Sequence, residues 1–134
     1  MTIELHWLIL TILLTAVLWI PYILNRLIEQ GVLSAFWDPD GETSTKVAWA
    51  ERLMSVHVNA VENLVVFAPL VIITHILDMN TELTASASLL YFFSRLAHVI
   101  LFTLRVPILR IIAFLGGFIA QMIFVFNLLA IINA

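Results

Sequence analysis

The chain has 134 residues, of which 63% are hydrophobic and 11% are charged, and its mean hydropathy is +1.09. Soluble domains are about half apolar and a quarter charged, so this composition excludes an ordinary soluble domain and indicates an integral membrane protein. A net charge of −3 with six Lys and Arg leaves no basic surface for nucleic acid, and the absence of cysteine excludes disulfides, thiolate metal sites and a protein thiol nucleophile.

The first predicted element is an apolar helix over 5–28. A transmembrane helix needs roughly 20 apolar residues. This segment is too long for a signal-peptide core, follows Glu4 rather than a basic region, and lacks a small-residue cleavage site. Pro21 predicts a kink in its last third. The polar stretch that begins at Glu29 is rich in turn and acidic residues and predicts a loop.

Three further helices complete the predicted order, over 46–77, 83–104 and 108–132. The first of these is longer than a bilayer requires, so we expect its initial turns to project into water. A polar turn over 78–82 and a break at Arg105-Val106-Pro107 separate the helices, because proline disfavours helix at the preceding residue. The chain 1–134 is therefore predicted as one all-α domain, a bundle of four transmembrane helices.

The basic residues predict how the chain crosses the membrane. Arg26, Lys46 and Arg52 flank the first loop and Arg105 and Arg110 flank the third, whereas the termini and the middle turn carry none. Basic residues accumulate on the cytoplasmic side of membranes. The first and third loops are therefore predicted to be cytoplasmic, with both termini outside the cytoplasm.

Polar side chains form stripes on three of the predicted helices. The stripe on the second helix covers an arc of about 100° and consists of Arg52, Ser55, Asn59, Glu62 and Asn63. The third helix carries Arg95 and His98 on one face, and the fourth carries Arg110, Gly117 and Gln121. Because a charge inside a membrane is costly, we expect Glu62 and Arg95 to pair at similar depth.

Two interpretations of this pair stay open. It either fixes the packing and register of the helices or forms part of a ligand site. No His and Glu spacing matches a zinc or di-iron motif, so no metal site is predicted. The pair Gly116-Gly117 predicts a close contact between helices. The predicted anchors at the membrane surface are Trp7, Trp37 and Trp49.

The segment from Glu51 to Leu70 resembles the signature of the MAPEG family, the membrane-associated proteins in eicosanoid and glutathione metabolism. The family pattern is a basic residue, then His-x-Asn-x-x-Glu-Asn, then a Phe and a Leu. The matching residues are Arg52, His57, Asn59, Glu62, Asn63, Phe67 and Leu70. Arg95 with His98, the turn from Val106 to Arg110, the length and the four spans also resemble the family.

The resemblance implies a homotrimer that binds glutathione between subunits near the cytoplasmic face and receives a lipophilic substrate from the bilayer. Family members conjugate glutathione to electrophiles, reduce lipid hydroperoxides or isomerise eicosanoid precursors. The nucleophile would be the glutathione thiol, and Arg110, close to solvent, is the candidate catalytic residue that stabilises the thiolate. The candidate ligand-binding residues are Arg52, Asn59, Glu62, Arg95 and His98.

The chain departs from the family pattern at three positions. Many glutathione-using members have an Arg two residues before the His and a Tyr at two later positions, where this chain has Ser55, Phe102 and Phe114. Each change removes a hydrogen-bond donor. The resemblance is thus to a divergent bacterial-type member, which implies the bacterial inner membrane. The alternative function is a non-catalytic protein of this fold that binds lipid or an amphipathic ligand; the lack of an inverted repeat disfavours a transporter.

Overall fold

The structure is a computed structural model that describes residues 1–42 and 44–130. Within these ranges the regular elements are helices, namely α1 (Ile3–Val17), α2 (Trp19–Gln30), α3 (Val32–Phe36), α4 (Ala48–Ile76), α5 (Glu82–Thr103) and α6 (Leu109–Leu129). α1 and α2 form one span, and this span, α4, α5 and α6 are each long and apolar enough to cross a membrane. The chain is an integral multi-pass membrane protein. The end predicted for the last helix, at 132, lies outside the described residues.

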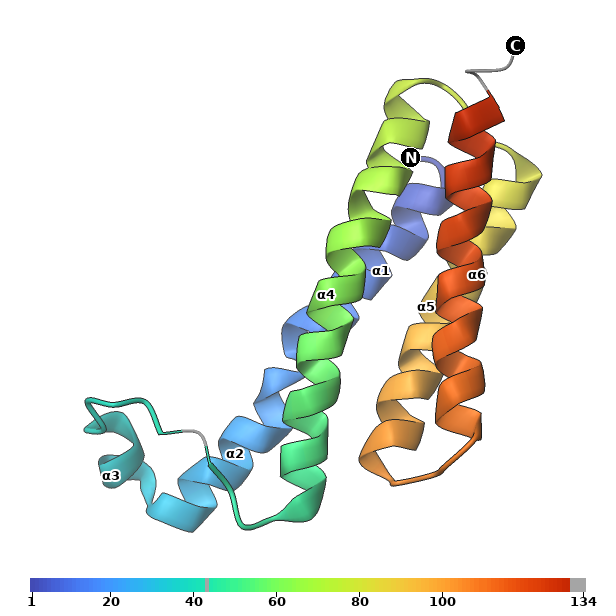
Figure 1. The fold of residues 1–134 in the computed structure, drawn as a ribbon. Coiled ribbons are helices and arrows are strands. Elements are labelled where there is room, and N and C mark those ends of the chain that lie inside the picture. Colours follow the sequence, from blue (N-terminus) through green and yellow to red (C-terminus); the bar gives the residue numbers. More distant parts are fainter. Residues whose placement is uncertain (43, 131–134) are drawn as a thin grey trace.

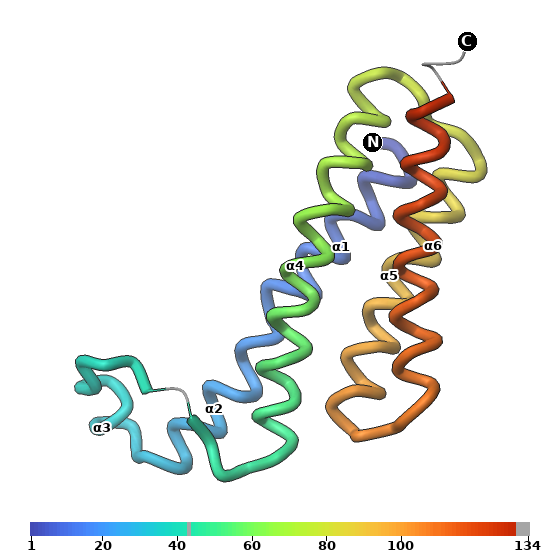
Figure 2. Tube along the Cα trace, viewed as in Figure 1, coloured from blue at the N-terminus to red at the C-terminus, as the bar shows by residue number. Residues whose placement is uncertain are grey.

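The spans run up and down as an antiparallel bundle, with the start of α1, the α4–α5 turn and the end of α6 at one end (Figure 1). The end of α2, the start of α4 and the α5–α6 turn lie at the other end (Figure 2). α5 and α6 pack along their length, and α1 packs against α4 and α5. The basic residues that flank the first and third loops therefore share one end of the molecule.

The first span is interrupted at Leu18. Pro21, in the first turn of α2, has no N–H to donate to the carbonyl of Val17, and its ring crowds that carbonyl. The N–H of Leu18 instead donates to the carbonyl of Thr15 at 3.4 Å. The kink predicted from Pro21 is present, and below it α2 packs against α4 and α3.

Two apolar clusters hold the bundle together. The larger one joins α1, α4, α5 and α6 and contains Leu8, Phe67, Val71, Ala87, Tyr91, Ala120 and Phe124. Within it, the rings of Phe67 and Tyr91 stack with 3.6 Å between their centroids, and Phe124 meets Phe67 edge-on at 5.7 Å. The second cluster lies towards the other end and contains Leu18, Leu53, Val56, Ala60 and Val99. The outer faces expose large apolar side chains, as expected for a surface in lipid.

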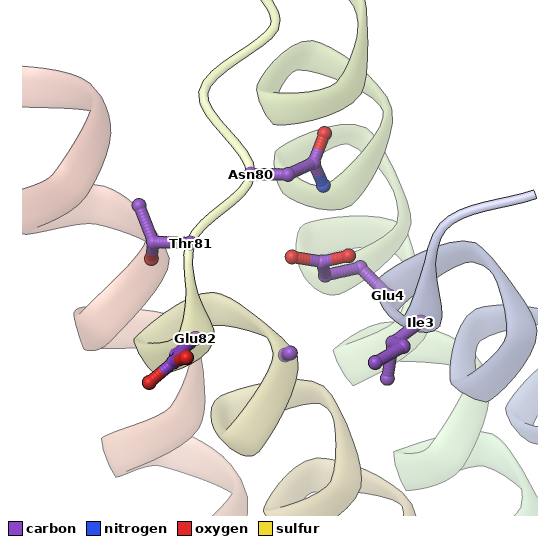
Figure 3. A pocket seen from close by; sticks show the side chains of 6 residues that line it. Ile3, Glu4, Asn80, Thr81 and Glu82 are labelled. Atoms are coloured by element: carbon purple, nitrogen blue, oxygen red, sulfur yellow. The ribbon is translucent and has the colours of Figure 1, made fainter.

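A buried carboxylate joins the first span to the third. Glu4 accepts a hydrogen bond from the Thr84 hydroxyl at 2.6 Å, and Thr84 also forms a capping box with Thr81 at the start of α5. Figure 3 shows Glu4 directed towards the turn that carries Asn80 and Thr81, at a cavity of about 260 Å³. No pattern in the sequence indicated this contact, because one carboxylate before an apolar helix has no periodicity to read.

Replacing Thr84 with valine should destabilise the bundle by about 1–3 kcal/mol, because Thr84→Val keeps the side-chain shape and leaves the buried Glu4 carboxylate without its donor. Thermal unfolding in detergent measures the loss. Ser86→Ala is the matched control, since the Ser86 hydroxyl is exposed and donates only to the carbonyl of Glu82 in its own helix. Equal melting temperatures for the two variants would contradict the role assigned to the Glu4–Thr84 bond.

Candidate functional site

Arg95 fills the space between α4, α5 and α6 and is only 3% exposed. One terminal guanidinium nitrogen donates to the carbonyl of Phe114 at 3.0 Å, and the other lies 3.5 Å from the Asn59 side-chain oxygen. The central guanidinium carbon is 5.4 Å from the centroid of the Tyr91 ring and 5.1 Å from that of Phe114. A carbonyl, an amide and two aromatic faces therefore surround this buried charge, while its Nε has no hydrogen-bond partner among the described residues.

Two glycines of α6 allow α5 to approach closely. A Cβ atom on Gly117 would overlap the terminal nitrogen of the Arg95 guanidinium and lie 2.7 Å from its Nε. A Cβ atom on Gly116 would lie 2.5 Å from the hydroxyl of Ser94. The close helix contact predicted from the glycine pair is confirmed, and at Gly117 the partner is a guanidinium.

The expected pairing of Glu62 with Arg95 is wrong within the chain. Among residues 1–42 and 44–130 the ion pair present joins Arg26 to Asp38, and Glu62 lies exposed on the outer face of α4. Asn59 takes the position near Arg95 instead. Asn59 and Glu62 are separated by about 60° around the helix axis, so α4 directs Asn59 inward while Glu62 points out of the bundle.

A second group of predicted residues gathers close to the α5–α6 turn. His98 and Arg110 line a cavity of about 200 Å³ together with Phe102, Ile111 and Phe114. The ring of His98 lies 5.7 Å from the rings of Phe102 and Phe114, measured between centroids. The guanidinium carbon of Arg110 lies 5.0 Å from the centroid of Phe102. Two of the positions that depart from the family pattern thus form walls of this cavity.

The contacts of Arg110 differ from those of Arg26, Arg52 and Arg95, the other arginines that are not fully exposed. Arg52 donates to the carbonyl of Thr103 at 2.8 Å, which ties the start of α4 to the end of α5. Arg26 pairs with Asp38, and Arg95 is bound as described. In the described part of the chain, Arg110 makes no hydrogen bond or ion pair and rests on an aromatic ring. Its charge is therefore available to an anion that enters the cavity.

The structure brings the predicted site residues together only in part. Asn59 meets Arg95, and His98 meets Arg110 at the cavity, whereas Arg52 and Glu62 join neither group. Phe114 belongs to both groups, since its carbonyl accepts from Arg95 and its ring lines the cavity. This double role depends on a backbone atom, which side-chain patterns do not reveal.

One further contact escaped prediction. The Tyr22 hydroxyl lies 2.9 Å from Nδ1 of His57 and joins α2 to α4. His57 belongs to the family signature, yet in this structure it makes a contact between helices and lies outside both groups of site residues. A single bond between residues far apart in the chain leaves no spacing that the sequence could show.

Adding a methyl group at Gly117 should cost about 1–3 kcal/mol, because Gly117→Ala forces the buried guanidinium of Arg95 out of its seat. In an Arg95→Leu background the same change should cost much less, so the two effects should be strongly non-additive in thermal unfolding. Gly116→Ala is the matched control, since it adds the same methyl group beside Ser94 and should cost the same in both backgrounds. Additive losses for Gly117→Ala would show that Arg95 does not occupy this seat.

The comparisons with known proteins agree with the fold. The model of the MAPEG family matches residues 5–130, which include both groups of site residues and the four spans except the first two residues of the first span. No curated protein and no solved structure matches the chain. The chain therefore belongs to the MAPEG family of membrane proteins, which act in eicosanoid and glutathione metabolism.

Proposed function

We propose that the chain is a glutathione-dependent transferase or peroxidase-like protein that acts on lipophilic electrophiles or lipid hydroperoxides. The observation that carries this proposal is the cavity lined by His98, Phe102 and Arg110, where a guanidinium without a protein anion faces an apolar space. A cation in a medium of low dielectric constant favours the thiolate over the thiol, and the thiolate is the reactive form.

The chemistry follows from that charge. The glutathione thiol loses its proton to water, and Arg110 stabilises the resulting thiolate. In a transfer reaction the sulfur attacks an electrophilic carbon, a C–S bond forms, and the leaving group departs with its electron pair. With a hydroperoxide the sulfur attacks oxygen, the O–O bond breaks, and an alcohol and a sulfenic acid result. A second glutathione then converts the sulfenic acid to a disulfide and water.

The size of the cavity supports a site shared between subunits. Its volume of about 200 Å³ is below the roughly 300 Å³ at which small-molecule pockets begin. One subunit thus offers space for the thiol end of a tripeptide, and a neighbouring copy would enclose the remainder. In this proposal Arg52 and Asn59 bind carboxylate and amide groups of glutathione. Glu62 accepts a hydrogen bond from the amino group of glutathione, and Arg95 positions Asn59.

A homotrimer in the bacterial inner membrane is the proposed assembly. Glu62 is exposed within a helix long and apolar enough to span a bilayer, and a carboxylate facing lipid is costly, which supports burial against another subunit. We propose that both termini lie outside the cytoplasm. The start of α4, which carries Arg52, and the α5–α6 turn and start of α6, which carry Arg105 and Arg110, lie at the opposite end of the bundle. Arg110 then faces the compartment in which a soluble thiol is present.

The second candidate function is a non-catalytic protein that binds lipid or an amphipathic ligand. The observation that favours it is the pair of phenylalanine rings, Phe102 and Phe114, which line the cavity without a hydroxyl group to donate to sulfur. Calorimetric titration of the purified protein with glutathione separates the two functions. Binding of glutathione with proton release near neutral pH supports the enzyme, and binding of lipid alone supports the alternative.

Removing the charge at Arg110 should lower thiol-dependent turnover by about a hundredfold, since the group stabilises developing negative charge on sulfur. Arg110→Lys should recover part of the rate, because charge matters more than fork geometry for a sulfur anion. The measurement is turnover of a lipophilic electrophile by Arg110→Ala, with thermal stability recorded alongside. Arg105→Ala, in the adjoining turn, is the control; full activity of Arg110→Ala with a loss in Arg105→Ala would refute the assignment.

Neutralising Glu62 should weaken the assembly. Glu62→Ala is expected to lower the fraction of trimer several-fold on dilution in mild detergent, since the carboxylate then no longer binds across the interface. Native mass spectrometry or light scattering measures the trimer. The control is Leu13→Ala, which removes an exposed apolar side chain from α1. A parent chain that is monomeric and retains its thermal stability would contradict the proposed homotrimer.

A further inference from the structure

Helix α3 (Val32–Phe36) stands apart from the bundle. It follows α2 directly after Gly31, whose φ of 84° is a left-handed conformation that favours glycine. α3 contacts α2 and projects sideways from the loop end of the molecule (Figure 1). The sequence predicted only turns in this stretch, because a helix of five residues is too short to show a period.

The outer surface of this segment is apolar. Leu33 is 85% exposed, Phe36 78% and Trp37 89%. The same surface continues onto the last turn of α2, where Ile28 is 83% exposed. Contact between water and several large apolar side chains is unfavourable, because removing such surface from water is the main driving force for burial. The segment is therefore shaped to meet an apolar medium.

Polar bonds next to this surface hold the segment in place. Arg26 forms an ion pair with Asp38 at 2.5 Å, and Asp38 accepts the backbone N–H groups of Asp40 at 3.0 Å and Glu42 at 2.8 Å. These two N–H groups, followed by the charge of Arg26, hold the pKa of Asp38 below its usual 3.8. The stabilisation is complete at neutral pH and is lost only as the pH falls through this lowered value.

An apolar cavity of about 480 Å³ lies between α2 and this segment. Apolar side chains that line it from α2 and α3 are Trp19, Ile23, Leu24, Leu27, Ala35 and Phe36. Leu24 and Phe36 also belong to the exposed apolar surface. The apolar surface thus runs without a break from the lipid-facing side of α2 to α3.

We propose that α3 and Trp37 lie in the interfacial layer of the membrane and insert Leu33, Phe36 and Trp37 among lipid headgroups and upper acyl chains. Charged and polar side chains, Arg26, Glu29 and Gln30, occupy the last turns of α2, so α3 follows at the level of the polar layer of the membrane. Tryptophan and phenylalanine next to charged groups are the side chains that favour this layer. The neighbouring carboxylates disfavour anionic headgroups, so the partner is a zwitterionic lipid surface. This inference is independent of the proposed catalytic function.

The absence of cysteine permits a direct test. Single-cysteine variants Phe36→Cys and Asp40→Cys carry an environment-sensitive fluorophore, and the labelled full chain is placed in phosphatidylcholine nanodiscs. A lipid with a nitroxide near the carbonyl level should quench the label at position 36 at least about twofold more than the label at position 40. Aqueous iodide should show the reverse preference. Ile28→Cys, at the lipid-facing end of α2, is the positive control.

Two outcomes would overturn the proposal. Equal quenching of both labels by iodide would place α3 in water. A label at position 36 that neither quencher reaches, together with cross-links between copies through that position, would make the occupant a second subunit. Leu33→Glu in the Phe36→Cys background checks that the apolar surface is the cause. It should move the label towards water and lower quenching by the nitroxide lipid.

Discussion

Arg95 carries a positive charge into a helix bundle that lies in hydrocarbon, and the packing of α4, α5 and α6 follows from the way that charge is satisfied. A backbone carbonyl of α6, an amide of α4 and two aromatic faces surround it. Their simultaneous approach requires Gly117, because any larger residue would overlap the guanidinium. One side chain thus fixes the separation of three helices and the rotation of α6 about its own axis.

The arginines of this MAPEG protein differ in whether they donate hydrogen bonds to backbone carbonyls of neighbouring helices. A terminal nitrogen of Arg95 donates to the carbonyl of Phe114 and Nε of Arg52 donates to that of Thr103, so both residues connect helices. Arg110 is left beside an apolar cavity with an aromatic ring as its neighbour. Phe114 links the two regions, since one residue supplies the carbonyl that positions Arg95 and the ring that limits the cavity.

The sequence predicts the spans well because a run of apolar residues long enough to cross a bilayer is a strong signal. The kink near Pro21 and the close approach at Gly116 and Gly117 were also predictable, since each depends on the geometry of one residue. The partner of Arg95 was not predictable from the sequence. A helical wheel gives the angles between side chains of one helix, but it does not give the rotation of that helix relative to its neighbours. Asn59 and Glu62 are separated by only about 60° around the axis of α4, so a small rotation of this helix determines which of the two lies near Arg95.

The break at Leu18 divides the first span into two rods with different attachments. α1 is fastened to α5 through Glu4 and Thr84, whereas α2 is fastened to α4 through Tyr22 and His57. Because α3 follows α2, the segment proposed to lie at the membrane surface is attached through Tyr22 and His57 to α4, the helix that carries the family signature. Asn59 of α4 continues this chain of contacts to Arg95 and, through the Phe114 carbonyl, to the wall of the cavity, so a change in bilayer thickness at α3 and the shape of the cavity are connected through α4.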